Sequence, residues 1–145
     1  MASIYTVDAS IFLNAFNPHE AGHDDSYRLL ARLQEQAAPI VAPTLLLPEA
    51  AAAISRGRED EALARKFAAA LGRLPHLVLI AVDLYLAQQA VEITAQYQLR
   101  GSDAVYAAVA LRFGSTLVTL DREQRERMQA VIPARFPAEV LAEVG

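Results

Sequence analysis

The chain has 145 residues, of which 54% are hydrophobic, with no cysteine and a formal net charge of −4. This composition fits one globular domain over residues 1–145, which buries roughly two thirds of the surface that the unfolded chain exposes, and the absence of cysteine excludes disulfides and thiolate metal sites. The negative charge argues against a broad cationic surface for nonspecific nucleic-acid binding, although it does not exclude a local site.

Apolar periodicity and turn residues predict alternating strands and helices. β-Branched and aromatic residues indicate the first strand, and a continuous apolar run indicates a third strand that is covered on both faces. In chain order we predict a strand at 4–7, a helix at 10–16, a helix from 24 or 25 to about 36, a strand at 40–42, helices at 44–54 and 59–74, a strand at 77–80, helices at 83–97 and from 101 to about 112, a strand at 116–119 and a short polar helix through 128. A last short helix is expected from Pro137.

The helix predicted at 44–54 has recognisable end signals. Thr44 can cap its first turn through the hydroxyl, and Pro48 is tolerated near that turn. Gly57 is expected to close the helix, because glycine is the commonest residue just past a helix end.

Strands that alternate with helices favour a parallel sheet. Parallel neighbours need crossover connections, and both faces of such a sheet must be covered by helices. We therefore predict an α/β fold, a three-layer α/β/α sandwich with a central parallel sheet of four to five strands.

Four acidic residues, Asp8, Glu49, Asp103 and Asp121, interrupt otherwise apolar stretches. Asp8 and Asp121 follow predicted strands, at the carboxyl ends where open parallel sheets bind ligands. Each acid also has a purely structural interpretation. The three aspartates could cap or stabilise the first turns of helices, and Glu49 could be a solvated helix edge or half of an ion pair.

Taken together, the four acids indicate a metal site. One acid from each of two strand ends and one from each of two helices can converge on one cleft, where carboxylates raise each other's pKa unless a cation is present. Oxygen ligands suit Mg²⁺ or Mn²⁺, which activate water and neutralise the charge that develops on a phosphodiester. We therefore predict that these residues are the metal-binding and catalytic residues of a nuclease.

Four short motifs surround these acids, in chain order. They are Tyr5-Thr6-Val7-Asp8-Ala9-Ser10, Leu47-Pro48-Glu49-Ala50, Leu99-Arg100-Gly101-Ser102-Asp103-Ala104-Val105-Tyr106-Ala107-Ala108 and Leu117-Val118-Thr119-Leu120-Asp121. Through them nearly the whole chain resembles the PIN-domain ribonucleases, particularly the VapC-type toxins of toxin–antitoxin pairs. Each motif alone is weak, but the order and spacing of all four are fairly specific.

This resemblance implies a PIN-like fold and a divalent-metal-dependent endoribonuclease. The four acids would hold one or two Mg²⁺ or Mn²⁺ ions, directly or through water, and activated water would attack the scissile phosphate. The products would carry 5′-phosphate and 3′-hydroxyl ends. A catalytically idle PIN fold that binds RNA or protein is the alternative.

Five further residues are candidates for supporting roles. By the resemblance, Ser10 and Thr119 match small hydroxyl positions that orient a carboxylate or a water, although both also fit an ordinary helix cap or strand end. Because the acids repel RNA, substrate binding is expected to use nearby cations, for which Arg100, Arg122 and Arg125 are candidates. A solvated helix surface explains Arg125 equally well.

His19-Glu20-Ala21-Gly22-His23 spells the pattern of zinc proteases, in which two histidines one helical turn apart bind zinc. The context argues against that function. Pro18 precedes the pattern, Gly22 lies inside it, and no apolar helix carries the two rings on a common face. A polar surface loop is therefore the preferred interpretation, with zinc proteolysis a minor alternative.

The resemblance also implies partners. The family commonly forms homodimers, and a toxin implies an RNA substrate and a small antitoxin whose C-terminal segment occupies the groove over the active site. The N-terminus lacks the basic region and apolar core of a signal peptide, and no apolar run approaches the roughly 20 residues of a membrane span. We therefore expect a cytoplasmic protein without a membrane segment.

Overall fold

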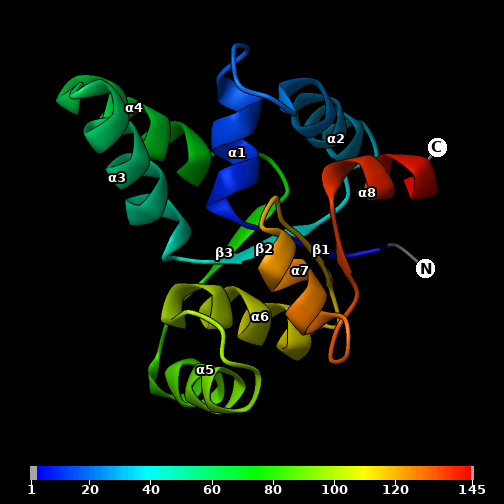
Figure 1. Cartoon of the computed structure of the whole chain (residues 1–145). Coiled ribbons are helices and arrows are strands. Elements are labelled where there is room, and N and C mark those ends of the chain that lie inside the picture. Colours follow the sequence, from blue (N-terminus) through cyan, green and yellow to red (C-terminus); the bar gives the residue numbers. More distant parts are fainter. Residues whose placement is uncertain (1–2, 145) are drawn as a thin grey trace.

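The computed structural model describes residues 3–144. Within that range the chain forms five strands and eight helices, and Figure 1 shows how they are arranged in space. In chain order they are β1 (Tyr5–Val7), α1 (Ala9–Phe16), α2 (His23–Glu35), β2 (Ile40–Pro43), α3 (Leu46–Arg58), α4 (Glu61–Gly72), β3 (Leu77–Ile80), α5 (Leu84–Tyr97), α6 (Gly101–Phe113), β4 (Thr116–Val118), α7 (Arg122–Met128), β5 (Ala134–Arg135) and α8 (Pro137–Val144).

The strands form one sheet in the order β3-β2-β1-β4-β5, and every pair is parallel. Helices α1, α2, α3, α4 and α8 lie on one side of this sheet, and α5 and α6 lie on the other (Figure 1). The predicted α/β/α sandwich with a parallel sheet of four to five strands is confirmed. Strand β5 has only two residues, which is too short for sequence periodicity to reveal.

The sheet changes direction of growth at its centre. From β1 the chain builds β2 and β3 on one side, and it later returns to build β4 and β5 on the other. Val7 at the end of β1 pairs with Val118 at the end of β4, so the carboxyl ends of these two strands lie side by side. This is the topological switch point, where such folds bind ligands.

The apolar core is built mainly from strand residues and from α6. The strand side chains Val7, Ile40 and Leu117 are almost completely buried. Helix α6 packs against α5 and against three strands, and five of its residues are alanine or valine with almost no exposure: Ala104, Ala107, Ala108, Val109 and Ala110. Small side chains let this helix approach the sheet closely, which brings its first turn near the switch point.

Two predicted end signals of α3 were wrong. The helix runs through Gly57 to Arg58, and Glu59 ends it in the left-handed conformation with φ 52°. Its N-cap is Leu45, which makes no side-chain capping bond, so Thr44 does not cap it. The Thr44 N–H donates to the Ile80 carbonyl at 2.9 Å, which extends the pairing of β2 with β3 by one residue.

The other predicted boundaries agree to within a few residues. Helix α4 begins after Asp60, whose carboxylate accepts the N–H of Leu63, rather than at Glu59. Helix α6 ends at Gly114, which adopts the left-handed conformation with φ 62° that glycine tolerates without strain. Between residues 3 and 144, no helix is long and apolar enough to cross a membrane.

Candidate active site

Asp8 lies at the carboxyl end of β1 and is also the N-cap of α1. Its Oδ1 accepts the backbone N–H of Ser10 at 3.1 Å and the Ser10 hydroxyl. The side chain is almost completely buried, and this burial raises its pKa to about 6, assisted by the nearby charge of Asp103. Hydrogen bonds from Ser10 and Thr119 oppose the rise. Asp8 is therefore both a helix-capping carboxylate and a buried acid at the switch point.

Asp121 follows β4 and is the N-cap of α7. Its Oδ1 accepts the N–H of Gln124 at 3.0 Å, and its own N–H donates to Thr119 Oγ1 at 3.0 Å. Its Oδ2 accepts Nη2 of Arg100 at 2.8 Å. The two oxygens of Asp121 thus have separate partners, one within its own helix and one across the site.

Asp103 lies in the first turn of α6 and is not the capping residue, which is Arg100. Its Oδ2 accepts Nε of Arg100 at 2.9 Å. Burial raises the pKa of Asp103 despite this guanidinium, and the charges of Asp121 and Glu123 add to the rise. Asp103 therefore lies in a region that already contains other carboxylates, which disfavour its charged form.

Glu49 lies in the first turn of α3 and is half-buried. Partial burial raises its pKa, the charge of Asp103 raises it further, and Arg100 and the Tyr106 hydroxyl lower it. Glu49 thus reaches the neighbourhood of Asp103 from the opposite side of the sheet.

Asp103 is the common neighbour of the other three acids, since its charge interacts with those of Asp8, Glu49 and Asp121. The four carboxylates are near enough to influence one another, but among residues 3–144 no three acidic or histidine side chains are close enough to form a complete ligand set for one ion. Their hard oxygen donors still fit Mg²⁺, which keeps several waters and needs only one or two direct carboxylates.

The three candidate arginines have different surroundings. Arg100 bridges Asp103 and Asp121. Arg125 instead forms a bidentate pair with Glu139 at 2.7 and 2.6 Å and lies 4.9 Å from the centre of the Phe136 ring, so it joins α7 to α8. Arg122, directly after Asp121, lies 5.7 Å from the same ring centre.

Tyr106 is a site residue that the sequence interpretation did not single out. Its side chain is only 2% exposed, and within the described chain its hydroxyl has no hydrogen bond of good geometry. The hydroxyl faces the carboxylate of Glu49, and burial together with that charge raises the tyrosine pKa. Its position three residues after Asp103, on the same helix face, was the available signal.

The zinc-protease pattern does not lie on one helix, because His19 and Glu20 precede α2 and only His23 belongs to it. His23 begins α2, and its Nδ1 lies 2.9 Å from the Asn14 carbonyl oxygen. Glu20 accepts a hydrogen bond from Asn14 Nδ2 at 2.8 Å, and His19 lies in the preceding turn. These contacts fasten the loop onto α1, in agreement with a polar surface loop.

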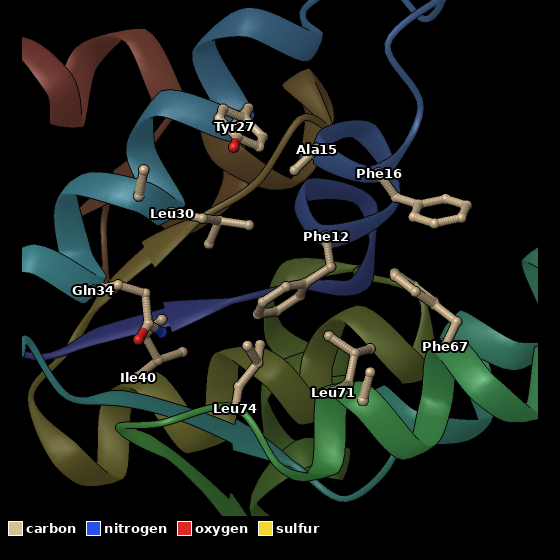
Figure 2. A pocket seen from close by; sticks show the side chains of 12 residues that line it. Phe12, Ala15, Phe16, Tyr27, Leu30, Gln34, Ile40, Phe67, Leu71 and Leu74 are labelled. Atoms are coloured by element: carbon tan, nitrogen blue, oxygen red, sulfur yellow. The ribbon is translucent and has the colours of Figure 1, made fainter.

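An apolar cavity of about 330 Å³ opens between α1, α2 and α4. Figure 2 shows side chains from all three helices lining it, with Phe12 from α1, Leu30 from α2 and Leu71 from α4. The aromatic rings of Phe16 and Phe67 lie 4.8 Å apart at one side. Tyr27, which also lines the cavity, is 59% exposed, so this side of the cavity faces solvent.

Several solved structures resemble this chain. VapC20 from Mycobacterium tuberculosis, a toxin that cleaves the sarcin-ricin loop, is 22% identical with a TM-score of 0.70 over 86% of this chain and 94% of that chain. PAE2754 from Pyrobaculum aerophilum is 23% identical with a TM-score of 0.70 over 99% of this chain and 96% of that chain. VapBC2 from Rickettsia felis, bound to a DNA fragment from its promoter, is 17% identical with a TM-score of 0.68 over 92% and 98%. At these identities the likeness shows the fold.

Family membership follows from the sequence profile. A search of curated proteins found no match. The profile of the PIN domain matches residues 5–128, a segment that includes all four acids and both strands of the switch point. The resemblance drawn from the four motifs is therefore confirmed, and the chain belongs to the PIN domain family.

Proposed function

We propose that this protein is a divalent-metal-dependent endoribonuclease and the toxin of a toxin–antitoxin pair. The observation that carries the proposal is the meeting of carboxylates from four elements at the switch point, with Asp103 as their common neighbour. Like charges gathered in this way are stabilised by a cation. The likeness to VapC20, which cleaves RNA, supports RNA as the substrate.

Asp8, Glu49, Asp103 and Asp121 would hold Mg²⁺ or Mn²⁺, directly or through water. When bound, the cation supplies a water of lowered pKa and offsets the negative charge that develops on the phosphodiester. Cleavage that leaves 5′-phosphate and 3′-hydroxyl ends requires the attacking oxygen to add to phosphorus and the 3′ oxygen to leave with a proton.

The chain's own residues prepare this site before substrate arrives. Ser10 restrains one oxygen of Asp8 through two hydrogen bonds, and Gln124 restrains one oxygen of Asp121. Such neighbours orient ligand carboxylates and tune their basicity. The burial of Asp8 excludes water, so that its interaction with a cation is stronger than at an exposed surface.

The experiment is cleavage of a mixed, fluorescently labelled RNA pool by metal-stripped protein, with Mg²⁺, Mn²⁺ or Zn²⁺ restored. Asp8→Asn should abolish cleavage with Mg²⁺ or Mn²⁺. Asp83→Asn is the matched control, because Asp83 caps α5 through the N–H of Leu86 at 2.9 Å and belongs to no part of the site. Equal cleavage by wild type and Asp8→Asn would refute the metal nuclease, and RNA binding without cleavage would favour the idle binding module.

The apolar cavity between α1, α2 and α4 is the surface that best fits an antitoxin segment. Helical segments commonly bind by placing apolar side chains in such a groove. One of the similar solved structures is a toxin–antitoxin complex from Klebsiella pneumoniae, which supports a partner of this kind. Co-purification with the product of the neighbouring gene, together with loss of RNA cleavage in the complex, would test the assignment.

A homodimer is also part of the proposal. Large apolar side chains at the β3 edge and on α5 remain exposed, including Leu84 at 73%, Tyr85 at 61% and Val91 at 63%. Contiguous exposed apolar residues commonly mark protein interfaces. Light scattering should give the mass of two chains for the wild type and of one chain for Val91→Glu.

A further inference from the structure

We propose that Arg100 is an internal counter-ion that occupies the cation-binding oxygens of Asp103 and Asp121, and that a divalent cation displaces it toward the RNA phosphate. This inference rests on the proposed nuclease function. It assigns Arg100 a positioning role, in which metal binding determines when the guanidinium becomes available to substrate.

The geometry shows that the guanidinium and a cation would compete for the same atoms. Nε of Arg100 lies 2.9 Å from Asp103 Oδ2, and Nη2 lies 2.8 Å from Asp121 Oδ2. The other oxygen of Asp121 is committed to the N–H of Gln124. A cation that binds Asp121 through Oδ2, the oxygen outside the helix cap, would therefore meet the Arg100 guanidinium, which also contacts Oδ2 of Asp103.

Hydrogen bonds that do not involve Arg100 hold the backbone around the site. Arg127 Nη1 donates to the carbonyl oxygens of Tyr97 and Gln98, at 3.2 and 2.9 Å, and thereby fixes the loop that precedes Arg100. Gln124 Nε2 donates to the carbonyl of Asp103 at 3.3 Å and joins α7 to α6. Release of the Arg100 guanidinium therefore leaves both acid-bearing elements in place.

The Arg100 side chain has room to move. It is 73% exposed, whereas the side chains of Asp103 and Asp121 are only 18% and 34% exposed. A polar cavity of about 140 Å³ adjoins the pair, lined in part by Glu123 and Arg127. An exposed ion pair is weak, so a divalent charge is able to replace it.

Once released from the two acids, the Arg100 guanidinium could bind an RNA phosphate. Its planar fork of donors matches the oxygens of phosphate, and it would lie beside the acids at which the scissile bond must be placed. Arg125 cannot serve in the same way, because both of its forked donors are paired with Glu139. Arg100 is thus the arginine whose present partners are themselves the proposed metal ligands.

The test is the affinity of metal-free protein for Mn²⁺, measured by calorimetry without RNA, for wild type, Arg100→Gln and Arg100→Lys. Arg100→Gln should bind Mn²⁺ roughly tenfold more tightly than wild type, because one competing charge has been removed. Arg100→Lys should fall between them, since an ammonium ion cannot bridge two carboxylates as a fork does. Arg65→Gln is the matched control, because it breaks an exposed arginine–carboxylate pair with Glu61 on α4.

A second readout concerns RNA. At saturating Mn²⁺, the slope of log kcat/KM for cleavage against log salt should be smaller in Arg100→Gln than in wild type by about one, as expected for one lost phosphate contact. Arg100→Gln should therefore bind metal more tightly and yet use RNA less well.

The outcomes separate the two proposals. If Arg100 only supports the loop, Arg100→Gln would bind Mn²⁺ as tightly as wild type or more weakly, and the counter-ion inference would be wrong. Binding of Mn²⁺ by the wild type would in that case still support the nuclease proposal. If neither wild type nor Arg100→Gln binds Mn²⁺, the nuclease proposal fails and the inference fails with it. Circular dichroism of each variant confirms that it is folded.

Discussion

Ser10 donates both its backbone N–H and its hydroxyl to a single oxygen, Oδ1 of Asp8. The pair lies where β1 passes into α1, so one carboxylate both starts a helix and faces the other acids. The second carboxylate oxygen of Asp8, Oδ2, accepts no hydrogen bond from Ser10. The two bonds from Ser10 thus restrain the proposed metal ligand Asp8.

Ser10→Ala tests this relationship. Loss of the hydroxyl should raise the pKa of Asp8 further, because the Ser10 hydrogen bond lowers it, and should reduce Mn²⁺ affinity and cleavage by roughly tenfold to a hundredfold. Ser10→Thr keeps a hydroxyl and should retain most of the activity. Equal Mn²⁺ affinity in wild type and Ser10→Ala would show that the hydroxyl contributes only to the cap.

The stability of the metal-free protein should fall as pH rises. Asp8 has a pKa of about 6 in the folded chain, against an ordinary value of 3.8, so the folded state binds more protons between these two pH values. The stability that the protonated form contributes is complete below pH 3.8 and is lost as pH rises through 6. The loss is about 3 kcal/mol at most by the usual conversion of a pKa shift.

Urea unfolding in EDTA between pH 4 and 7.5 measures this effect. Asp8→Asn should be more stable than wild type at pH 7 and should lose most of the pH dependence, since asparagine also caps helices. Asp83→Asn should follow the wild-type profile. A constant difference between wild type and Asp8→Asn across this range would contradict the raised pKa.

Tyr106→Phe distinguishes the contribution of the buried ring to stability from the effect of the hydroxyl on Glu49. The ring is buried, but the described residues offer its hydroxyl no well-formed hydrogen bond, so its removal should change the free energy of unfolding by no more than about 1 kcal/mol. The hydroxyl lowers the pKa of Glu49, so the acidic limb of the pH–rate profile should move to higher pH in Tyr106→Phe. An unchanged profile would indicate that Tyr106 only fills the core.

Two neighbouring alanines on α4 test the antitoxin surface. Ala70 lines the apolar cavity and Ala69 does not, although both are exposed. Ala70→Arg should weaken binding of the neighbouring gene's product by at least about tenfold, because a charge would enter an apolar groove. Ala69→Arg should bind normally, and both variants should cleave RNA as wild type does. Normal partner binding by Ala70→Arg would place the partner elsewhere.

Several features of the site could be predicted from residue order alone. Asp8 and Asp121 follow strand-like runs, and parallel strands place their carboxyl ends at one edge, so their approach follows from the fold class. The contacts of Arg125 could not be predicted, because its partners Glu139 and Phe136 belong to a tail without clear periodicity. Gly57 and Thr44 were misinterpreted because local end signals fix a helix boundary only to within one or two residues.

The sequence by itself determined the alternation of strands and helices, the order of the four acids and the PIN family, since these depend on local periodicity and on motif spacing. The tertiary structure alone decided which oxygen of each acid meets which partner. Arg100 reaches Asp121 across 21 residues of chain, and the Tyr106 hydroxyl faces Glu49 from another helix. Such contacts depend on how closely the helices pack against the sheet, and a packing distance is a property of all the buried side chains together.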